Sequence, residues 1–217
     1  MPQKPVKPIE VVLPELTPFD GDRLEADGDY DSLEFRGLDL SEQEASGARF
    51  LECAVVDCRL DGSRFRRAHF IDCTLTSLRS SGLHLSQATW REVVMSDCRI
   101  GAFSADGSKL TRLRVVGGKY DYLNLRSAVL DDVSFEGCRL DEVDLSEANA
   151  RNVRFVDCRI EQLNVSGASL DDLDLSKAEI HVLLGTSSLA GAVISQVQLM
   201  DLAAVLAGHL RIRVSDT

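Results

Sequence analysis

One phrase recurs along this chain at regular intervals. It reads VVDCRLDG, MSDCRIGA, FEGCRLDE and FVDCRIEQ, and its cysteine is Cys58, Cys98, Cys138 and Cys158 in turn. The residue numbers of successive cysteines differ by 40, 40 and 20, so every interval is a multiple of the smallest. A fixed period of this length is typical of repeat architectures, in which each unit packs only against its neighbours. We therefore interpret the smallest interval as one coil of a solenoid.

Within this unit, apolar residues recur every five residues. Steps of five from Phe35 to Ile180 meet 30 positions, of which only Ser80 is polar. A second track, two residues before the first, is small or aliphatic almost throughout and contains all six cysteines. Neither a 3.6-residue helix nor a two-residue strand alternation has a period of five. A chain that turns a corner every five residues does, and four such sides close a square coil.

The coils should stack through backbone hydrogen bonds at the ordinary strand spacing of about 4.8 Å, with one large and one small residue of each five filling the axis. Thirty five-residue sides, four to a coil, make 7.5 coils. Cysteine suits the small track as a buried apolar group, so we expect reduced thiols. Phe103 and Ala105 exchange large and small positions, and we expect bulges or loops near Gln43 and near Ser80.

The motifs LDEVDLSEANARNVRF and SGASLDDLDLSKAEI resemble the pentapeptide-repeat family, whose ideal repeat is A(D/N)Lxx. The resemblance implies an all-β solenoid, a right-handed quadrilateral parallel β-helix of pentapeptide repeats. We divide the chain into a Pro-rich acidic leader at 1–30, the β-helix at 31–182 and a C-terminal cap of a helix and a short strand at 183–217. We expect the leader to be partly disordered, with IEVVLPEL as a candidate edge-protecting segment.

The C-terminal cap begins with a helix signal. Ser195 followed by Gln198 predicts a capping box that opens the helix QVQLMDLAAVLA, which Gly208 should end, and HLRIRV predicts the strand. The helix is apolar on most of its sides, which indicates a second buried surface. A closing helix and strand are similar to the dimerisation module of the quinolone-resistance branch of the family, so we expect a homodimer; a monomeric cap is the alternative. The candidate dimer residues are Val197, Leu199, Met200, Leu202, Val205 and Leu206.

The net charge of −11 is unevenly distributed. Acidic and basic residues number 12 and 4 in residues 1–47, 7 and 12 in 48–120, 14 and 6 in 121–180, and 2 and 2 in the tail. The acid-rich coils supply a candidate interaction surface. Its residues are Asp131, Asp132, Asp141, Glu142, Asp144, Glu147, Asp171, Asp172 and Asp174.

A basic ladder is the competing charged feature. One cation per coil precedes the large core residue on one side, and neighbouring acids favour a charge-compensated, solvated face. The ladder residues are Arg59, Arg79, Arg99, Lys119, Arg139 and Arg159.

The sequence does not indicate an enzyme, a metal site or a cofactor. The loop from Asp27 has Ser32 and Leu38 where a calcium loop needs glycine and glutamate, and the four histidines are far apart. No apolar run is long enough to span a membrane, and no secretory signal opens the chain, so we expect a cytoplasmic protein.

We therefore expect a non-enzymatic protein that binds another macromolecule. The family resemblance implies a DNA mimic that binds DNA gyrase and modulates quinolone sensitivity. The alternative is a structural scaffold or spacer without topoisomerase activity. Direct nucleic-acid binding through the basic ladder is the least favoured reading.

Overall fold

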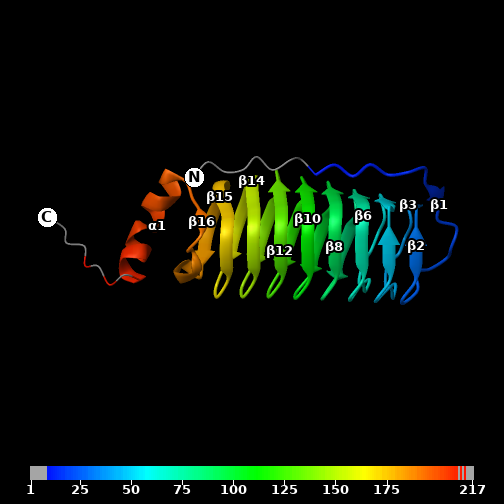
Figure 1. Cartoon of the computed structure of the whole chain (residues 1–217), viewed down its shortest axis with the longest axis horizontal. Coiled ribbons are helices and arrows are strands. Elements are labelled where there is room, and N and C mark those ends of the chain that lie inside the picture. The colour runs from blue at the N-terminus through cyan, green and yellow to red at the C-terminus, as the bar shows by residue number, and fades with distance from the viewer. Residues whose placement is uncertain (1–8, 210, 212, 214–217) are drawn as a thin grey trace.

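The computed structural model describes residues 9–209, 211 and 213. In this part the chain forms a rod-shaped parallel β-solenoid of about nine turns with one C-terminal helix (Figure 1). The solenoid has more turns than the 7.5 coils expected from the five-residue register, because strands extend beyond both ends of that register. Thr17–Pro18 (β1) pairs with Leu33–Arg36 (β3), and Ala192–Val193 (β16) pairs with the preceding long strand.

The remaining elements follow the chain around the coil. They are β2 (Asp29–Asp31), β4 (Arg49–Leu51), β5 (Ala54–Val56), β6 (His69–Thr76), β7 (Arg79–His84), β8 (Thr89–Ser96), β9 (Arg99–Ser104), β10 (Lys109–Val116), β11 (Lys119–Asn124), β12 (Val129–Glu136), β13 (Arg139–Asp144), β14 (Asn149–Asn164), β15 (Ser169–Leu184), a 3-10 turn (Thr186–Ser188) and α1 (Gln196–His209).

Each strand lies parallel to the strand one coil away, and the offset between paired residues is the smallest interval of the repeated phrase. Lys109 pairs with Val129 and Trp90 with Leu110, and the same offset holds from β2 to β14. It changes at the two ends, where Thr17 pairs with Leu33 and Leu173 with Ala192, and at an irregularity between β14 and β15, where Val156 pairs with Lys177. The strands form two stacks, one of β6, β8, β10 and β12 and one of β7, β9, β11 and β13, which β14 joins. The period that was read from the sequence is therefore the hydrogen-bonding register of the structure.

The corners of the coil are built from left-handed backbone. Asp57, Arg67 and Ser77 have φ values of 53°, 58° and 56°, and residues at the same place in other fives share this conformation. It costs an L residue about 1–2 kcal/mol. Hydrogen bonds between stacked corners help to offset that cost, as from the Asp57 amide to the Thr76 carbonyl at 2.9 Å.

The two residue tracks fill the interior as expected. Every large-track residue from Phe35 to Leu175 is buried, and Ile180 at the open end is half-buried. Tyr30, Phe50, Phe70 and Trp90 stack one above another, with successive ring centroids 4.9, 4.9 and 4.4 Å apart. The core is therefore one continuous column.

All six cysteines are buried and unpaired. Their thiols donate hydrogen bonds to backbone carbonyls, as Cys53 does to Leu51 at 3.2 Å. Burial raises the pKa of the Cys98 thiol to about 11 and also raises the pKa of Cys58. All six thiols pack as small core groups, and the raised pKa makes Cys58 and Cys98 poor nucleophiles.

The expected irregularities resolve in different ways. Phe103 and Ala105 are both buried, which confirms the size exchange. The bulge or loop expected near Ser80 was wrong, because β7 runs through it in register and the Ser80 hydroxyl donates to the Leu60 carbonyl at 2.8 Å. Gln43 closes the first coil by accepting a hydrogen bond from the Leu24 amide at 3.0 Å.

Residues 9–16, here called the strap, lie along the outside of the rod and reach β1 at its N-terminal end (Figure 1). Ile9 is only 2% exposed although it lies outside the core column, and Glu10 is close enough to Arg114 to help raise the pKa of that side chain. Residues that pair in register from one coil to the next form rows along the rod. The row that contains Arg114 ends at Glu34, beside β1. The leader is thus ordered from Ile9 onward, and its first eight residues lie outside the described part.

The C-terminal helix α1 begins with the expected capping box. Gln198 donates its amide hydrogen to the Ser195 hydroxyl at 3.2 Å, and its side chain accepts one from the Ser195 amide at 2.7 Å. The helix continues through Gly208 to His209, one residue past the expected end. The strand expected in HLRIRV lies largely outside the described residues.

Candidate interaction surfaces

The candidate acidic residues lie on both strand stacks. Asp131 and Asp171 belong to β12 and β15, and both pair in register with Arg151 of β14. Asp141, Glu142 and Asp144 belong to β13 in the other stack. The acidic residues therefore encircle the C-terminal coils.

Two aspartate pairs face each other across a shallow hollow. Its volume is about 400 Å³, and it is lined by Asp131, Asp132, Arg151, Asn152, Asp171 and Asp172. Arg151 forms an ion pair with Asp131 at 2.5 Å, and Asn152 donates a hydrogen bond to Asp132. The four carboxylates thus lie around a single guanidinium, which leaves a local excess of negative charge.

Four of the five other acidic candidates are held by partners on the surface, whereas Glu142 is exposed and has no ion pair among the described residues. Asp141 forms an ion pair with Lys119 at 2.9 Å, and Glu147 forms one with Arg126 at 2.8 Å. Asp144 accepts a hydrogen bond from the Ser146 amide at 2.8 Å. Asp174 lies on β15 and accepts one from the Ser176 amide at 2.9 Å. These carboxylates have restricted positions, as a surface that binds a partner in one geometry requires.

The basic ladder is a true column in the structure. Its six cations stack in register along the rod, with Asp39 before the first and Glu179 after the last. Lys119 hydrogen-bonds Asp121 and Asp141, which raises the pKa of the ammonium group, and Arg159 pairs with Glu161 at 2.9 Å. The column is therefore charge-compensated over much of its length, as expected for a solvated face.

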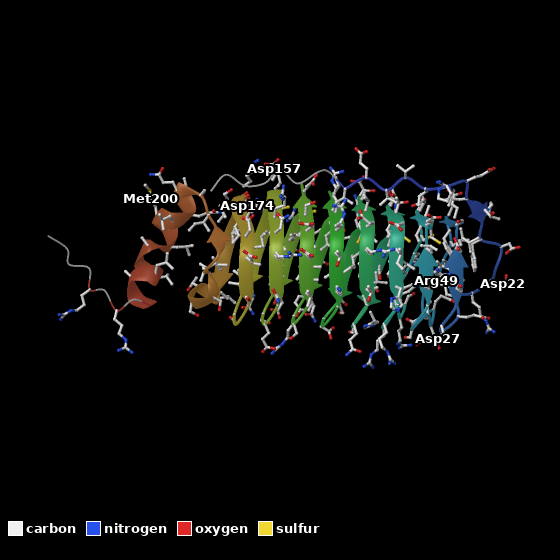
Figure 2. The ribbon with its side chains drawn as sticks, viewed as in Figure 1. Asp22, Asp27, Arg49, Asp157, Asp174 and Met200 are labelled. Carbon is white, nitrogen blue, oxygen red and sulfur yellow. The ribbon has the colours of Figure 1, made fainter. Side chains whose placement is uncertain are left out.

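The C-terminal helix divides its apolar residues between two sides. Leu202 and Leu206 are half-buried, whereas Val197, Met200 and Val205 are 68%, 67% and 47% exposed. Met200 projects from the helix at the end of the rod (Figure 2). Leu199 is also exposed, at 49%. A space of about 280 Å³ separates the helix from the last coil, and its lining is Leu175, Ile180, His181, Leu183, Ile194, Gln198, Asp201 and Leu202.

The described residues contain no group of three or more His, Cys, Asp or Glu side chains that could hold a metal ion. Among the same residues, no helix has the length and apolar character needed to cross a membrane.

The sequence reasoning missed one charged cluster. Arg64, Arg66 and Arg67 lie together on one corner of the coil, within the segment SRFRRAHF. Phe65 and Phe70 of this segment were expected in the core, but no basic site was predicted there. Three arginines within four residues are the signal that could have indicated it.

Residues 128–203 match the family model described as pentapeptide repeat region. No curated protein matches the chain. Among solved structures, HetL, a pentapeptide repeat protein involved in heterocyst differentiation regulation from the cyanobacterium Nostoc sp. strain PCC 7120, is 16% identical with a TM-score of 0.30, over 81% of this chain and 93% of that one. Full-length QnrB1, a plasmid-mediated fluoroquinolone resistance protein, is 15% identical with a TM-score of 0.37, over 85% of this chain and 100% of that one. The family match over residues 128–203, together with the five-residue register and the parallel coil of four fives, shows that the chain contains a pentapeptide-repeat region.

Proposed function

We propose that this protein is a non-enzymatic DNA mimic whose acidic coils bind DNA gyrase and modulate quinolone sensitivity. The charge density of those coils is the observation that carries the proposal. Residues 121–180 contain 14 acidic and 6 basic residues, an excess of 8 negative charges over three coils. Three coils span about 14 Å, which gives about one net charge per 1.8 Å of axis. Duplex DNA has one per about 1.7 Å.

The aspartate pairs give this charge a regular arrangement. Asp131 and Asp171 lie two coils apart in one register row, a separation of roughly 10 Å along the rod. A cationic groove that accepts DNA phosphates would meet carboxylates at repeated positions along a stiff axis. The stiffness of the rod favours binding because little conformational entropy is lost when the complex forms.

The proposed active form is a homodimer joined through α1. The exposed apolar side of the helix is the support for this part of the proposal, together with the space that the helix leaves above the last coil. A second copy could bury both surfaces. Pairing there would place the acidic coils of both subunits on either side of the junction, so that the anionic stretch doubles in length.

Sedimentation velocity tests the dimer. The wild type should sediment as a dimer at micromolar concentration, and a Val197→Asp, Met200→Asp variant should sediment as a monomer with an unchanged far-ultraviolet spectrum. A matched variant on the strap, Val12→Asp, should remain dimeric because Val12 is 90% exposed and belongs to a segment that runs along the rod toward β1, away from α1. A wild-type monomer would overturn the dimer.

Binding to immobilised gyrase tests the partner. The protein should bind, and linear duplex DNA should compete with it for the same site. Binding that excess DNA leaves unchanged would place the contact elsewhere and overturn DNA mimicry. An absence of binding would favour the alternative function, a spacer whose rod only sets a distance.

We place the protein in the cytoplasm. Six free, buried thiols support a reducing compartment, where cysteines remain unpaired.

A further inference from the structure

A corner of the rod distant from the acidic coils presents a cluster of uncompensated positive charge. It consists of Arg64, Arg66 and Arg67, here called the basic corner. All three side chains are exposed, and none forms an ion pair or a side-chain hydrogen bond with another described residue. Arg64 does lie near Glu44, since it helps to lower the pKa of that carboxyl group.

The neighbouring coils place further basic side chains along the rod. His84 pairs in register with Arg64, and His69 follows Arg67 on the same coil. Lys109 lies in the same row as His69, two coils further on, and is exposed without an ion pair among the described residues. Arg49, one coil before His69, is already engaged by Asp29 at 2.7 Å.

Four acids lie around the basic corner. The Asp27 carboxylate lies over Gly47, one coil before Arg67, and the Glu42 carboxylate lies over Gly62. Glu44 accepts a hydrogen bond from the Ser46 amide at 3.1 Å, and Asp106 accepts one from the Ser86 hydroxyl at 2.8 Å. None of these carboxylates forms an ion pair with Arg66 or Arg67 within the described part of the chain, unlike the acids beside most cations of the basic ladder.

Unpaired arginines on one turn repel one another, and an arriving anion relieves that repulsion. The planar guanidinium also binds a carboxylate or phosphate through two parallel hydrogen bonds, so a set of them recognises anions with geometric specificity. Because the three side chains project from a convex edge, the fitting partner is a segment that lies over the corner.

The extent of the positive charge decides between short and long anions. The row that contains Arg67 has Asp27 two coils before it and Glu147 four coils after it. Because Arg49 is paired with Asp29, the free cations extend from the basic corner to Lys109, two coil steps or about 10 Å. A helical turn of duplex DNA is about 34 Å long and would meet the acids at both ends. An extended acidic peptide of about three residues matches this length.

We propose that the basic corner is a docking site for a short acidic segment of a partner protein. It is a different surface from the acidic coils, so this inference goes beyond the proposed DNA mimicry. The two surfaces have opposite charge and lie on different coils, which allows one rod to hold two partners, or two parts of one partner, at a fixed separation.

The test is the affinity of a fluorescein-labelled hexaglutamate peptide, measured by fluorescence anisotropy at low salt. The wild type should bind it, and Arg66→Glu, Arg67→Glu should weaken the affinity by about tenfold or more, because two attractions become repulsions. Glutamate fits this corner conformation, since Glu147 holds the place of Arg67 with φ 59°. The variant should therefore fold as the wild type does.

The matched control is Arg79→Glu, Arg99→Glu, which changes the net charge equally on the basic ladder. These side chains are exposed and, among the described residues, have no ion pair. The control should change the affinity by less than about twofold. Equal losses in both variants would show only a net-charge effect and would overturn the docking site.

A labelled 20-base-pair duplex provides the second comparison. Weaker binding of the duplex than of the peptide is expected, and tighter binding that the Arg66→Glu, Arg67→Glu variant abolishes would overturn the peptide in favour of nucleic acid. Changing Asp131, Asp132, Asp171 and Asp172 to Asn should leave the affinity for the peptide at least as high as in the wild type. This result separates a failure of the basic corner from a failure of the acidic coils.

Discussion

At the scale of single residues, the fold depends on how closely backbones approach between coils. Gly118 occupies the small track where Cys98 and Cys138 stand in the adjoining coils. It has φ +84°, and a Cβ atom there would lie 2.3 Å from the Cys98 carbonyl oxygen. Gly137 also has positive φ, at +63°, but a Cβ atom there would have no neighbour within 4 Å.

We therefore expect Gly118→Ala to destabilise the protein more than Gly137→Ala. The control should cost about 1 kcal/mol, the ordinary penalty of a left-handed alanine. Gly118→Ala adds a clash with backbone that cannot rotate away, for a total of about 3 kcal/mol or more. Urea unfolding followed by circular dichroism measures both, and equal midpoints would contradict the predicted close approach.

The sequence was most informative at this scale. A period of five residues with one large and one small inward residue is compatible with few folds, so the sequence alone places Phe35, Trp90 and Phe155 in the core column. Corner conformation could not be read, because Asp57, Arg67 and Ser77 share no side-chain property that encodes positive φ. Their conformation comes from the stacked coils rather than from local preference.

At the scale of elements, segments that lie outside the repeat pack onto the rod. Gln198 joins α1 to the last coil, since its side-chain amide donates to the Leu175 carbonyl at 2.8 Å and the Ala178 carbonyl at 3.0 Å. The strap has no repeat, so its path could not be predicted. Its Glu10 lies near Arg114, whose row of paired residues includes Val94 and Ala54, and Ala54 is only 5% exposed.

Gln198→Ala should loosen the helix from the rod. It removes half of the capping box and both bonds to the last coil, a loss of about 1–3 kcal/mol. Hydrogen exchange of the α1 amides should speed up accordingly. Gln196→Ala, at an exposed position of the same turn, should leave exchange nearly unchanged, and equal rates in the two variants would show that Gln198 does not anchor the helix.

Ile9→Asp should release the strap. Burying an aspartate where Ile9 now packs is unfavourable, so hydrogen exchange across residues 10–16 should increase while the core coils keep their protection. Val12→Asp is the control, because Val12 is 90% exposed and should tolerate the charge. Unchanged exchange in Ile9→Asp would mean that the strap is held by other contacts.

At the scale of the whole molecule, the rod is a stack of coils whose surface charge changes along its axis. Many carboxylates are stabilised in the folded state by hydrogen bonds. Arg114, followed by Ser134, lowers the pKa of Glu136, and the Ser81 amide and Arg59 lower the pKa of Asp61. The ion pairs that produce these effects depend on side-chain positions, which explains why the sequence indicated the charge pattern but not the pairing.

A lowered folded-state pKa means that these carboxylates stabilise the fold above their ordinary pKa, near 4, and lose this contribution as the pH falls through the folded value. We expect unfolding at low pH. Glu136→Gln should lower stability by about 1 kcal/mol at pH 7, with the difference shrinking as the pH falls below the ordinary carboxyl pKa near 4. Glu142→Gln, at an exposed carboxylate without an ion pair in the described part of the chain, is the control. A difference that stays constant on acidification would contradict this assignment.

The central claim is that the acidic coils act as a DNA-like surface on gyrase. The direct measurement is a supercoiling assay that titrates the protein against gyrase, with and without a fluoroquinolone, beside a variant with Asp131, Asp132, Asp171 and Asp172 changed to Asn. A control with Asp20, Asp22, Asp57 and Asp97 changed to Asn has the same net charge and leaves the acidic coils intact. We predict inhibition or drug protection in the wild type and the control, and a clear loss of the effect in the first variant. No effect of the wild type at any concentration, or equal effects of all three proteins, would contradict the claim.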